Sequence, residues 1–291
     1  MLAVIAETPG PIDTVVIRDV PEPGELRAGE VVVRMLVSTF NPSDAVTVSG
    51  AYASRTAFPL VPGFEGVGII DRIGPGVPIS MLGQRVLPIG SPGAWQQYKR
   101  IDHSWCIPVP EDIPTDVACF AYINPLTASL MVERFCHGVQ SALVDAATTT
   151  IAGHLKTLLE QRGVETVMVG RTWGTVGVDK QFDVAFDCVG GEMGRRVARA
   201  VKPDGVVVHY GLLSGEPLGE TGRRVEMFRL RDVVHACPRS ELPELFVDVF
   251  SQLRAGRLHS QVAREVDLRD MLAALREYQP REGKLLIRIG H

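Results

Sequence analysis

The order of strand-like and helix-like segments is the feature of this sequence that most constrains its fold. Over residues 1–110, short runs of β-branched residues alternate with turn signals rich in proline and glycine. Many short strands joined by such turns are typical of a β-barrel or a β-sandwich. The strands expected in this region cover residues 15–17, 31–33, 66–73 and 85–89.

From residue 115 onward the pattern changes to helices that alternate with strands. A helix is expected from Thr115 to Phe135, and a buried strand is expected to start at Ser141. The hydroxyl groups of residues 148–150 then precede an apolar stripe, which indicates a capped helix. That stripe consists of Ile151, Leu155, Leu158 and Leu159. Further strands are expected at 164–169, 182–189 and 206–210, and further helices at 191–201 and 241–253.

Strand–helix–strand units of this kind form parallel sheets. Only ten residues (172–181) separate two of the expected strands, whereas a parallel crossover normally needs a dozen or more. We therefore expect a small sheet, or one that lacks an element. Residues 285–289 are expected to form a closing strand that returns to the N-terminal β domain.

Composition excludes several classes of protein. The chain of 291 residues has a net charge of −4, which provides no electrostatic footprint for nucleic acid or an anionic membrane. No apolar stretch approaches the length of a membrane-spanning helix, and Met1–Glu7 lack the basic region of a signal peptide. The five cysteines form no CxxC pair, which favours a reducing compartment. We expect a cytoplasmic protein.

Several motifs resemble the medium-chain dehydrogenase/reductase superfamily, in particular its zinc-free branch of quinone oxidoreductases and 2-enoyl thioester reductases. They are the run from Asn41 to Tyr52, the segment Pro62–Gly66, and the shorter pieces 93–95, 124–127, 186–191 and 283–284. The resemblance implies an α/β protein with a GroES-like β-barrel domain and an inserted, shortened Rossmann-type parallel sheet domain. Residues 1–118 and 259–291 would form the first domain, and residues 119–258 the second.

The resemblance also implies a set of catalytic residues. Tyr52 would donate a proton or stabilise charge on the substrate carbonyl oxygen, and Asn41 and Trp95 would border the substrate cleft. Each has a structural alternative. Tyr52 could pack in a turn, Asn41 could satisfy local backbone groups before Pro42, and Trp95 could simply cover the end of the barrel.

The coenzyme implied by the resemblance is NADPH. Arg171 ends a predicted strand where NAD-dependent enzymes carry an acidic residue, so a 2′-phosphate is favoured over NAD. The glycine motif of the family is degenerate, because Thr150 and Ala152 occupy two of its glycine positions. The residues expected to bind the coenzyme are Asn124, Thr127, Thr149, Thr150, Ile151, Arg171, Cys188, Val189, Tyr210, Gly211 and Lys284.

A metal site is not expected. Zinc-dependent members of the superfamily carry a histidine where this chain has Phe64, and no cysteine precedes Cys106. The expected function is therefore a zinc-independent, NADPH-dependent reductase of an activated C=C bond in an enoyl thioester, an enone or a quinone. Similar proteins commonly form homodimers through the edge strands of their inserted domains.

The alternative is a family member with weakened or lost coenzyme binding. Both the missing glycines and the short connection affect the half of the molecule that would hold the nucleotide. Such a protein would act as a non-redox enzyme or as a binding protein in a biosynthetic pathway.

Overall fold

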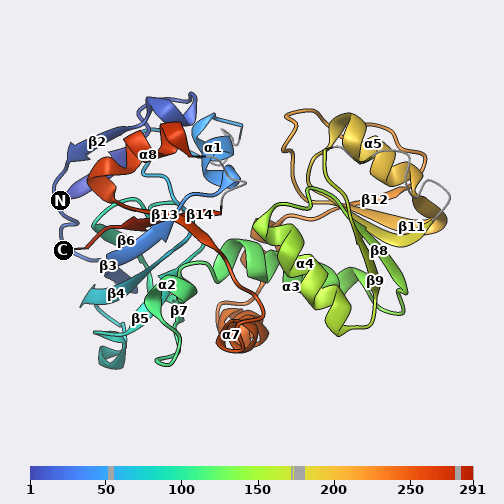
Figure 1. Cartoon of the computed structure of the whole chain (residues 1–291). Helices are drawn as coiled ribbons and strands as arrows, with labels where there is room; N and C mark the ends of the chain where they lie inside the picture. The colour runs from blue at the N-terminus through green and yellow to red at the C-terminus, as the bar shows by residue number, and fades with distance from the viewer. Residues whose placement is uncertain (52–55, 172, 174–180, 279–282, 291) are drawn as a thin grey trace. The chain divides into compact units, whose positions relative to one another are not determined.

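The computed structural model describes residues 1–51, 56–171, 173, 181–278 and 283–290. The chain forms two compact units (Figure 1). The first consists of Met1–Ile123 and Val233–His291, and the second of Asn124–Asp232. The second unit is therefore an insertion in the first. None of the helices formed by the described residues is long and apolar enough to cross a membrane.

The first unit is built on a mixed, seven-stranded sheet. Six strands follow the order β13-β14-β3-β4-β5-β7, β6 pairs with β3, and β1 and β2 form a separate antiparallel pair. The elements are β1 (Leu2–Ile5), β2 (Val16–Asp19), β3 (Glu30–Thr39), α1 (Pro42–Val48), β4 (Gly66–Ile73), β5 (Arg85–Pro88), β6 (Tyr98–Asp102), β7 (Cys106–Pro108), α2 (Thr115–Ala118), α7 (Val247–Arg254), β13 (Val262–Asp267), α8 (Met271–Glu277) and β14 (Lys284–Arg288).

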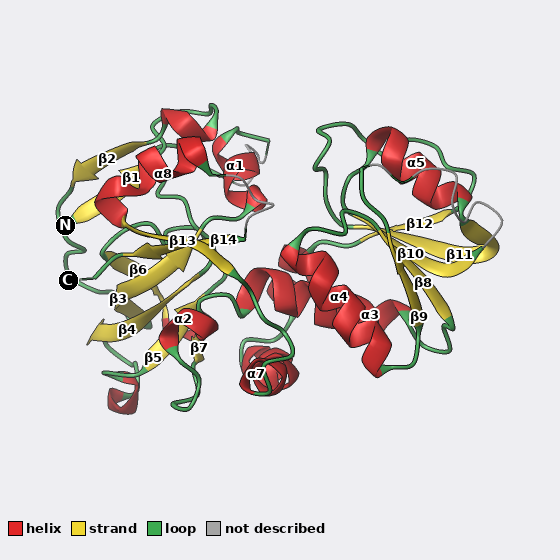
Figure 2. Ribbon diagram, viewed as in Figure 1, coloured by secondary structure: helices red, strands yellow, loops and turns green. Residues whose placement is uncertain are grey.

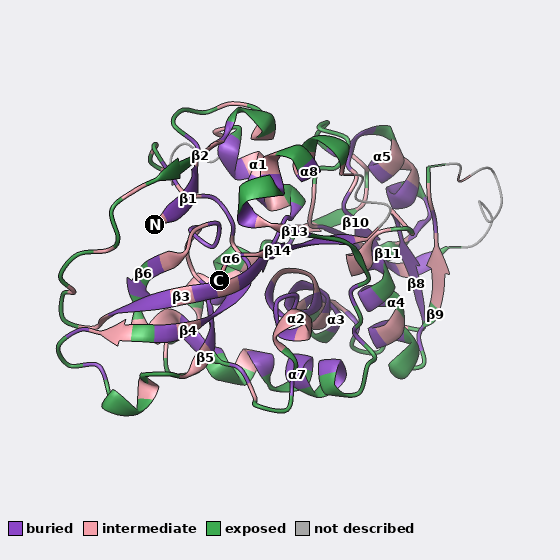
Figure 3. Ribbon diagram, turned by 60° about the vertical axis from the view of Figure 1, so that its left-hand side comes forward, coloured by how far each residue is buried: buried purple, intermediate pink, exposed green. Residues whose placement is uncertain are grey.

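The strand β3 is central because it pairs with β14, β4 and β6. It is buried over most of its length (Figure 3), which agrees with its run of valines. Two sequence predictions are confirmed here. The strand β4 has the predicted bounds, and β14 returns to the N-terminal part of the chain by pairing Ile287 with Ser38.

The second unit is built on a five-stranded sheet in which every strand pair is parallel. The strand order is β12-β11-β10-β8-β9. The helices α3 and α4 contact each other on one face, and α5 covers the other (Figure 2). The elements are α3 (Thr127–Phe135), β8 (Ser141–Val144), α4 (Thr150–Gln161), β9 (Glu165–Met168), β10 (Phe182–Asp187), α5 (Gly191–Arg199), β11 (Val201–His209) and β12 (Arg224–Met227).

This strand order is that of a doubly wound, Rossmann-type sheet without a strand beyond β9. In the described part of the chain, β9 is an edge strand. The shortened sheet predicted from the connection at 172–181 is therefore present. The sheet still contains the point at which its strand order reverses, between β8 and β10.

Two helical segments differ from the sequence predictions. The helix expected from Thr115 to Phe135 is divided into α2, a π-helical turn at Tyr122–Leu126 that contains Pro125, and α3. Because proline cannot donate the backbone hydrogen bond of a helix interior, it interrupts the regular α-helix. Similarly, Pro243 lies in a 3-10 helix, Leu242–Phe246, that precedes α7.

The boundary between the units also differs from the one expected. The segment 233–258 was expected in the inserted domain, but it belongs to the first unit. The reason is that α7 contacts α2, and the 3-10 helix Leu242–Phe246 contacts β7. The helix α6 (Leu230–Ala236) contains the point at which the chain returns to the first unit.

Candidate functional site

The carboxyl ends of the parallel strands in the second unit carry most of the residues expected to bind a coenzyme. Because the strands are parallel, the loops that follow them meet at one edge of the sheet. The residues that this edge brings together are Thr149, Thr150 and Ile151 after β8, Arg171 after β9, Cys188 and Val189 after β10, and Tyr210 and Gly211 after β11. Asn124 and Thr127 lie elsewhere, in the π-helical turn and at the first position of α3.

The N-terminus of α4 can hold an anion at this edge. Thr149 caps the helix, and its Oγ1 atom accepts a hydrogen bond of 3.3 Å from the backbone N–H of Ala152. The backbone N–H groups of Thr150 and Ile151 have no acceptor within the helix. Such amides, together with the helix dipole, bind phosphate groups. The methyl group of Ala152 is buried. Hence the methyl group that replaces a hydrogen atom of the family's glycine does not lie on the exposed side of the helix end.

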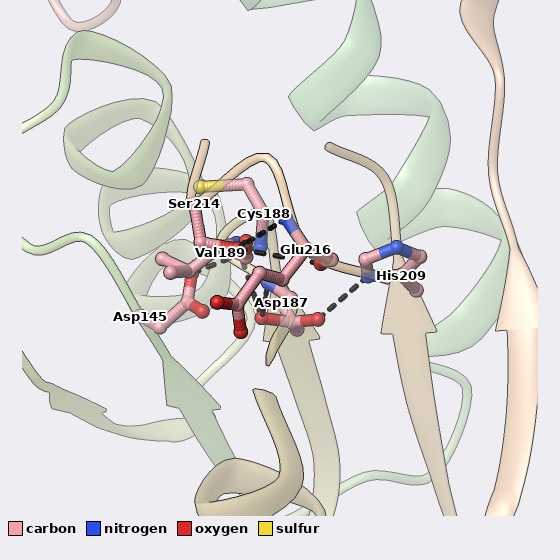
Figure 4. Close-up of polar contacts among 8 residues, drawn as sticks. Asp145, Asp187, Cys188, Val189, His209, Ser214 and Glu216 are labelled. Atoms are coloured by element: carbon pink, nitrogen blue, oxygen red, sulfur yellow. Dashed lines mark hydrogen bonds and ion pairs between the residues drawn. The ribbon is translucent and has the colours of Figure 1, made fainter. Parts of the chain in front are cut away.

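An acidic cluster lies at the point where the strand order reverses (Figure 4). Asp187, the last residue of β10, accepts hydrogen bonds from the backbone N–H groups of Val189 at 3.1 Å and Gly190 at 3.0 Å. Its Oδ2 atom lies 2.6 Å from Nδ1 of His209, the last residue of β11. Asp145 directly follows β8, and its Oδ1 atom accepts a hydrogen bond of 3.0 Å from the backbone N–H of Cys188. That bond connects the two strands between which the order reverses.

The ionisable groups of this cluster change one another's pKa values. Burial, followed by the hydrogen bond and the negative charge of Asp187, raises the pKa of Asp145 to about 8. Burial acts to raise the pKa of Asp187 as well, but its hydrogen bonds with His209, Asp145 and the backbone of Gly190 lower that pKa below its usual value. Burial also raises the pKa of the Cys188 thiol well above its usual value. Cys188 is therefore not an activated nucleophile.

The loop after β11 is hydrogen-bonded to the loop after β10. The backbone N–H of Leu213 donates to the carbonyl oxygen of Cys188, and both the backbone N–H and the hydroxyl group of Ser214 donate to that of Val189. Gly190 has a φ of 71°, and a Cβ atom there would lie 2.5 Å from the carbonyl oxygen of Glu216. The close approach of the two loops therefore requires glycine at this position.

A second buried polar cluster lies inside the first unit. Lys284 Nζ lies 2.5 Å from Asn41 Oδ1, and Asn41 Nδ2 donates to Glu65 Oε2 at 2.8 Å. The other oxygen of Glu65 accepts the backbone N–H groups of Tyr122 at 2.9 Å and Ile123 at 2.7 Å. The structure thus joins Asn41 and Lys284, two residues that the sequence singled out separately.

Burial dominates the electrostatics of this second cluster. It raises the pKa of Asp44 to about 7, although the backbone N–H groups of Asn41 and Phe64 hydrogen-bond to that carboxylate. Burial also raises the pKa of Glu65 and lowers that of Lys284, while the attraction between these two charges opposes both shifts. The Lys284 ammonium is engaged by Asn41 and lies inside the unit.

The two other residues expected to be catalytic have different positions. Trp95 is fully buried, and its Nε1–H donates a hydrogen bond of 3.0 Å to the carbonyl oxygen of Thr39. Gly63 has a φ of 90°, and a Cβ atom there would lie 2.4 Å from Trp95 Cδ1. The structure therefore places Trp95 in the core of the first unit. Tyr52 lies outside the described residues.

Sequence reasoning missed Asp145, His209 and the role of Asp187. A signal was present, because acidic residues end or follow two strands that were both expected in one parallel sheet. Among the described residues, no group of three or more histidine, cysteine, aspartate or glutamate side chains could hold a metal ion.

Comparison with known proteins identifies the family. The model for the alcohol dehydrogenase GroES-like domain matches residues 27–111, and the model described as zinc-binding dehydrogenase matches residues 162–285. The mitochondrial enoyl-[acyl-carrier-protein] reductase of Arabidopsis thaliana is 27% identical over 249 residues, which cover 74% of this chain and 66% of that protein. The enzyme of the same name from Bos taurus is 27% identical, over 84% of this chain and 76% of its own length.

Solved structures show the same fold. A Bacillus thuringiensis protein described as an NADPH:quinone reductase superposes with a TM-score of 0.89 at 26% identity and covers 99% of this chain and 98% of its own. The Escherichia coli quinone oxidoreductase complexed with NADPH has a TM-score of 0.85 at 19% identity, over 99% of this chain and all of its own (100%). The two matching domain models, their order along the chain and the doubly wound sheet lead to one conclusion: this chain belongs to the medium-chain dehydrogenase/reductase superfamily.

Proposed function

We propose that the protein is an NADPH-dependent reductase that transfers hydride to an activated C=C bond. The observation that carries the proposal is the carboxyl edge of the parallel sheet, where the free amides of α4 lie next to the point at which the strand order reverses. Ligands of doubly wound sheets bind at such a point. The enoyl reductases and the NADPH-complexed quinone oxidoreductase among the similar proteins support the same coenzyme and reaction.

The residues of this edge fit the coenzyme. The backbone N–H groups of Thr150 and Ile151 would bind the pyrophosphate. The exposed side chain of Arg171 would pair with the 2′-phosphate, and a guanidinium group suits that geometry. NADPH, when bound, supplies the hydride. The remaining residues of the second unit proposed to line the coenzyme are Asn124, Thr127, Thr149, Cys188, Val189, Tyr210 and Gly211.

The proposed proton donor is Tyr52. Hydride addition to an α,β-unsaturated carbonyl compound leaves negative charge on the carbonyl oxygen. A hydroxyl group near that oxygen stabilises the charge or delivers a proton to the α-carbon. We propose that the substrate is an enoyl thioester, an enone or a quinone, and that the reaction is zinc-independent. A chelator should then leave turnover unchanged.

A second candidate function is favoured by one observation. Thr150 and Ala152 stand at two glycine positions of the family motif, and the side chain of Thr150 is half-exposed at the helix end. A family member that no longer binds a coenzyme would be a non-redox enzyme or a binding protein. Measured binding of NADPH separates the two candidates.

We also propose a homodimer formed through the second unit. The edge strand β12 and the preceding loop expose large apolar side chains, namely Leu212, Leu213, Val225 and Met227. Light scattering coupled to gel filtration should give twice the mass of one chain, which is 31.7 kDa.

Turnover with a panel of acceptors tests the proposed reaction. The absorbance of NADPH should fall when an enoyl thioester, an enone or a quinone is added, and NADH should be a poorer donor. Oxidation of NADPH with none of the three classes would contradict the proposed reaction.

The variant Tyr52→Phe tests the proton donor. Removal of a general acid typically lowers turnover by about 100-fold to 10,000-fold, whereas the dissociation constant of NADPH should not change. Tyr98→Phe, a change of the same kind in β6, is the matched control. Wild-type turnover in Tyr52→Phe would show that the hydroxyl group has no role in the reaction.

A further inference from the structure

We propose that Asp145 holds a proton beside the charged Asp187, and that this singly ionised pair sets the pH range over which the second unit binds an anionic dinucleotide. Asp145 would then be a positioning and specificity residue, since it is fully buried and would act on the ligand through its charge. The inference rests on the proposed binding of NADPH at the carboxyl edge of the sheet.

The hydrogen bonding of Asp145 favours a protonated side chain. Its Oδ1 atom accepts the backbone N–H of Cys188, but its Oδ2 atom is buried and has no partner among the described residues. A charged carboxylate oxygen without a donor is costly in a protein interior. A proton on Asp145 removes this cost, because it makes the oxygen a donor and Asp187 is the neighbouring acceptor.

The hydrogen bonds of the two carboxyl groups determine which of them keeps the proton. Asp187 accepts hydrogen bonds from two backbone N–H groups, and its Oδ2 atom lies 2.6 Å from Nδ1 of His209, so its charged form is well stabilised. Among the described residues, Asp145 accepts one backbone hydrogen bond, from the N–H of Cys188. Two adjacent buried carboxyl groups do not both ionise near neutral pH. The better-solvated Asp187 therefore carries the charge, and Asp145 carries the proton.

The buried basic group in contact with this pair is His209, whose Nδ1 atom lies 2.6 Å from Asp187. Cys188 and Tyr210 are held neutral, because burial and the nearby carboxyl groups raise the pKa of each. The helix α4 contributes one buried titratable residue, His154, and Arg171 after β9 is exposed. The charged residues of α5 that pair with one another are Glu192, Arg195 and Arg199.

The position of Asp145 links its charge to the ligand. It precedes the cap of α4 by four residues, so it lies in the loop that would receive the pyrophosphate. A neutral Asp145 leaves the positive end of the helix dipole free to act on the phosphates. An ionised Asp145 adds a negative charge below them. Binding should therefore weaken as pH rises through the pKa of Asp145, which is about 8.

Calorimetric titration of NADPH into wild type, Asp145→Asn and Asp204→Asn tests this inference. Binding that requires one proton weakens by up to about tenfold per pH unit above the pKa, so the wild-type dissociation constant should rise about tenfold between pH ~7 and pH ~9. Asp145→Asn keeps an acceptor for the Cys188 amide and cannot ionise, so its affinity should stay level. Asp204→Asn removes the same charge from an exposed site of the second unit. The pH dependence of its dissociation constant should be that of wild type.

Infrared spectroscopy of the free protein provides a measurement that needs no coenzyme. The spectrum of wild type minus that of Asp145→Asn should contain the C=O stretch of a buried carboxylic acid at neutral pH, and this band should disappear as pH rises through about 8. The subtraction removes the bands of the other buried carboxyl groups with raised pKa values, Asp44 and Glu65. A wild-type spectrum in which no carboxylic acid band disappears near pH 8 would exclude the proton on Asp145 even if the variant failed to fold.

The outcomes separate the two proposals. Equal pH profiles in wild type and Asp145→Asn, or a wild-type spectrum without the carboxylic acid band, overturn this inference and leave the reductase proposal standing. If no protein binds NADPH at any pH, the proposed function fails, and the role of Asp145 in coenzyme binding fails with it.

Discussion

At the scale of single residues, the first unit contains ionisable side chains that are buried in its interior. Glu65 and Lys284 are both buried, and Asn41 lies between them as a donor to one and an acceptor from the other. Replacing one member of a buried charged pair leaves the other charge buried without a partner, which is destabilising. Replacing both members leaves no unpaired buried charge. The cluster therefore stabilises the unit only when both charged residues are present.

A double-mutant cycle tests this coupling. Glu65→Gln and Lys284→Met should each lower the free energy of unfolding by about 3–5 kcal/mol. The double variant should lose clearly less than the sum of the two, because neither charge is then left alone. Urea denaturation followed by tryptophan fluorescence measures all four proteins.

Arg254→Met is the control for this cycle. Its partner Asp112 is exposed, as is Arg254 itself, so the loss of this ion pair should change stability little. Additive losses in the cycle would mean that Glu65 and Lys284 do not interact.

At the scale of elements, α4 depends on its first turn for both stability and the proposed binding of phosphate. Thr149→Ala removes the hydroxyl group that accepts the N–H of Ala152, and should cost about 1 kcal/mol of stability. It should also weaken binding of NADPH, because the helix end is less ordered. Thermal unfolding with and without NADPH measures both effects.

Thr157→Ala in the same helix is the matched control. Its hydroxyl group donates to the carbonyl oxygen of Gly153 within the helix, and its loss should be nearly neutral. Equal effects of the two substitutions would contradict the assignment of Thr149 as the cap.

Elements with a strong pattern were predictable from the sequence. The strand at 66–73 has turn signals on its C-terminal side, and the apolar stripe and threonine cap of α4 were visible. The helix α1 was not predicted, since its seven residues include the β-branched Val46, Thr47 and Val48, which disfavour helices. The segment 202–205 was expected to be a turn, but it is part of β11, which begins at Val201. The pairing of β11 with β10 shifts its register within this segment.

The polar clusters show the limit of local patterns. Lys284 and Asn41 are 243 residues apart, and the bond between Asp187 and His209 spans 22 residues. Each side chain was visible in the sequence, but only the pairing of strands determines which of them meet. The candidate residues of the sheet edge were predictable as a group, because parallel strands place their carboxyl ends together.

At the scale of the whole molecule, each unit has its own core and its own polar cluster. Both ends of the chain build the first unit, since β14 pairs with β3 and the two ends share one hydrophobic core that includes Val4, Val33 and Leu285. The second unit buries a separate core, which includes Leu143, Ala185 and Val207. A ligand that binds the second unit should therefore stabilise it without any requirement for the catalytic residues of the first.

The most direct test of the central claim is the thermal unfolding of the wild-type protein in the presence of NADPH. We expect a saturable rise in melting temperature. At about 100 times the dissociation constant, the added stability should be about 2.7 kcal/mol. NADH should have a smaller effect because Arg171 would lack its 2′-phosphate partner. An unchanged melting temperature at millimolar NADPH would contradict the claim that this sheet edge binds the coenzyme.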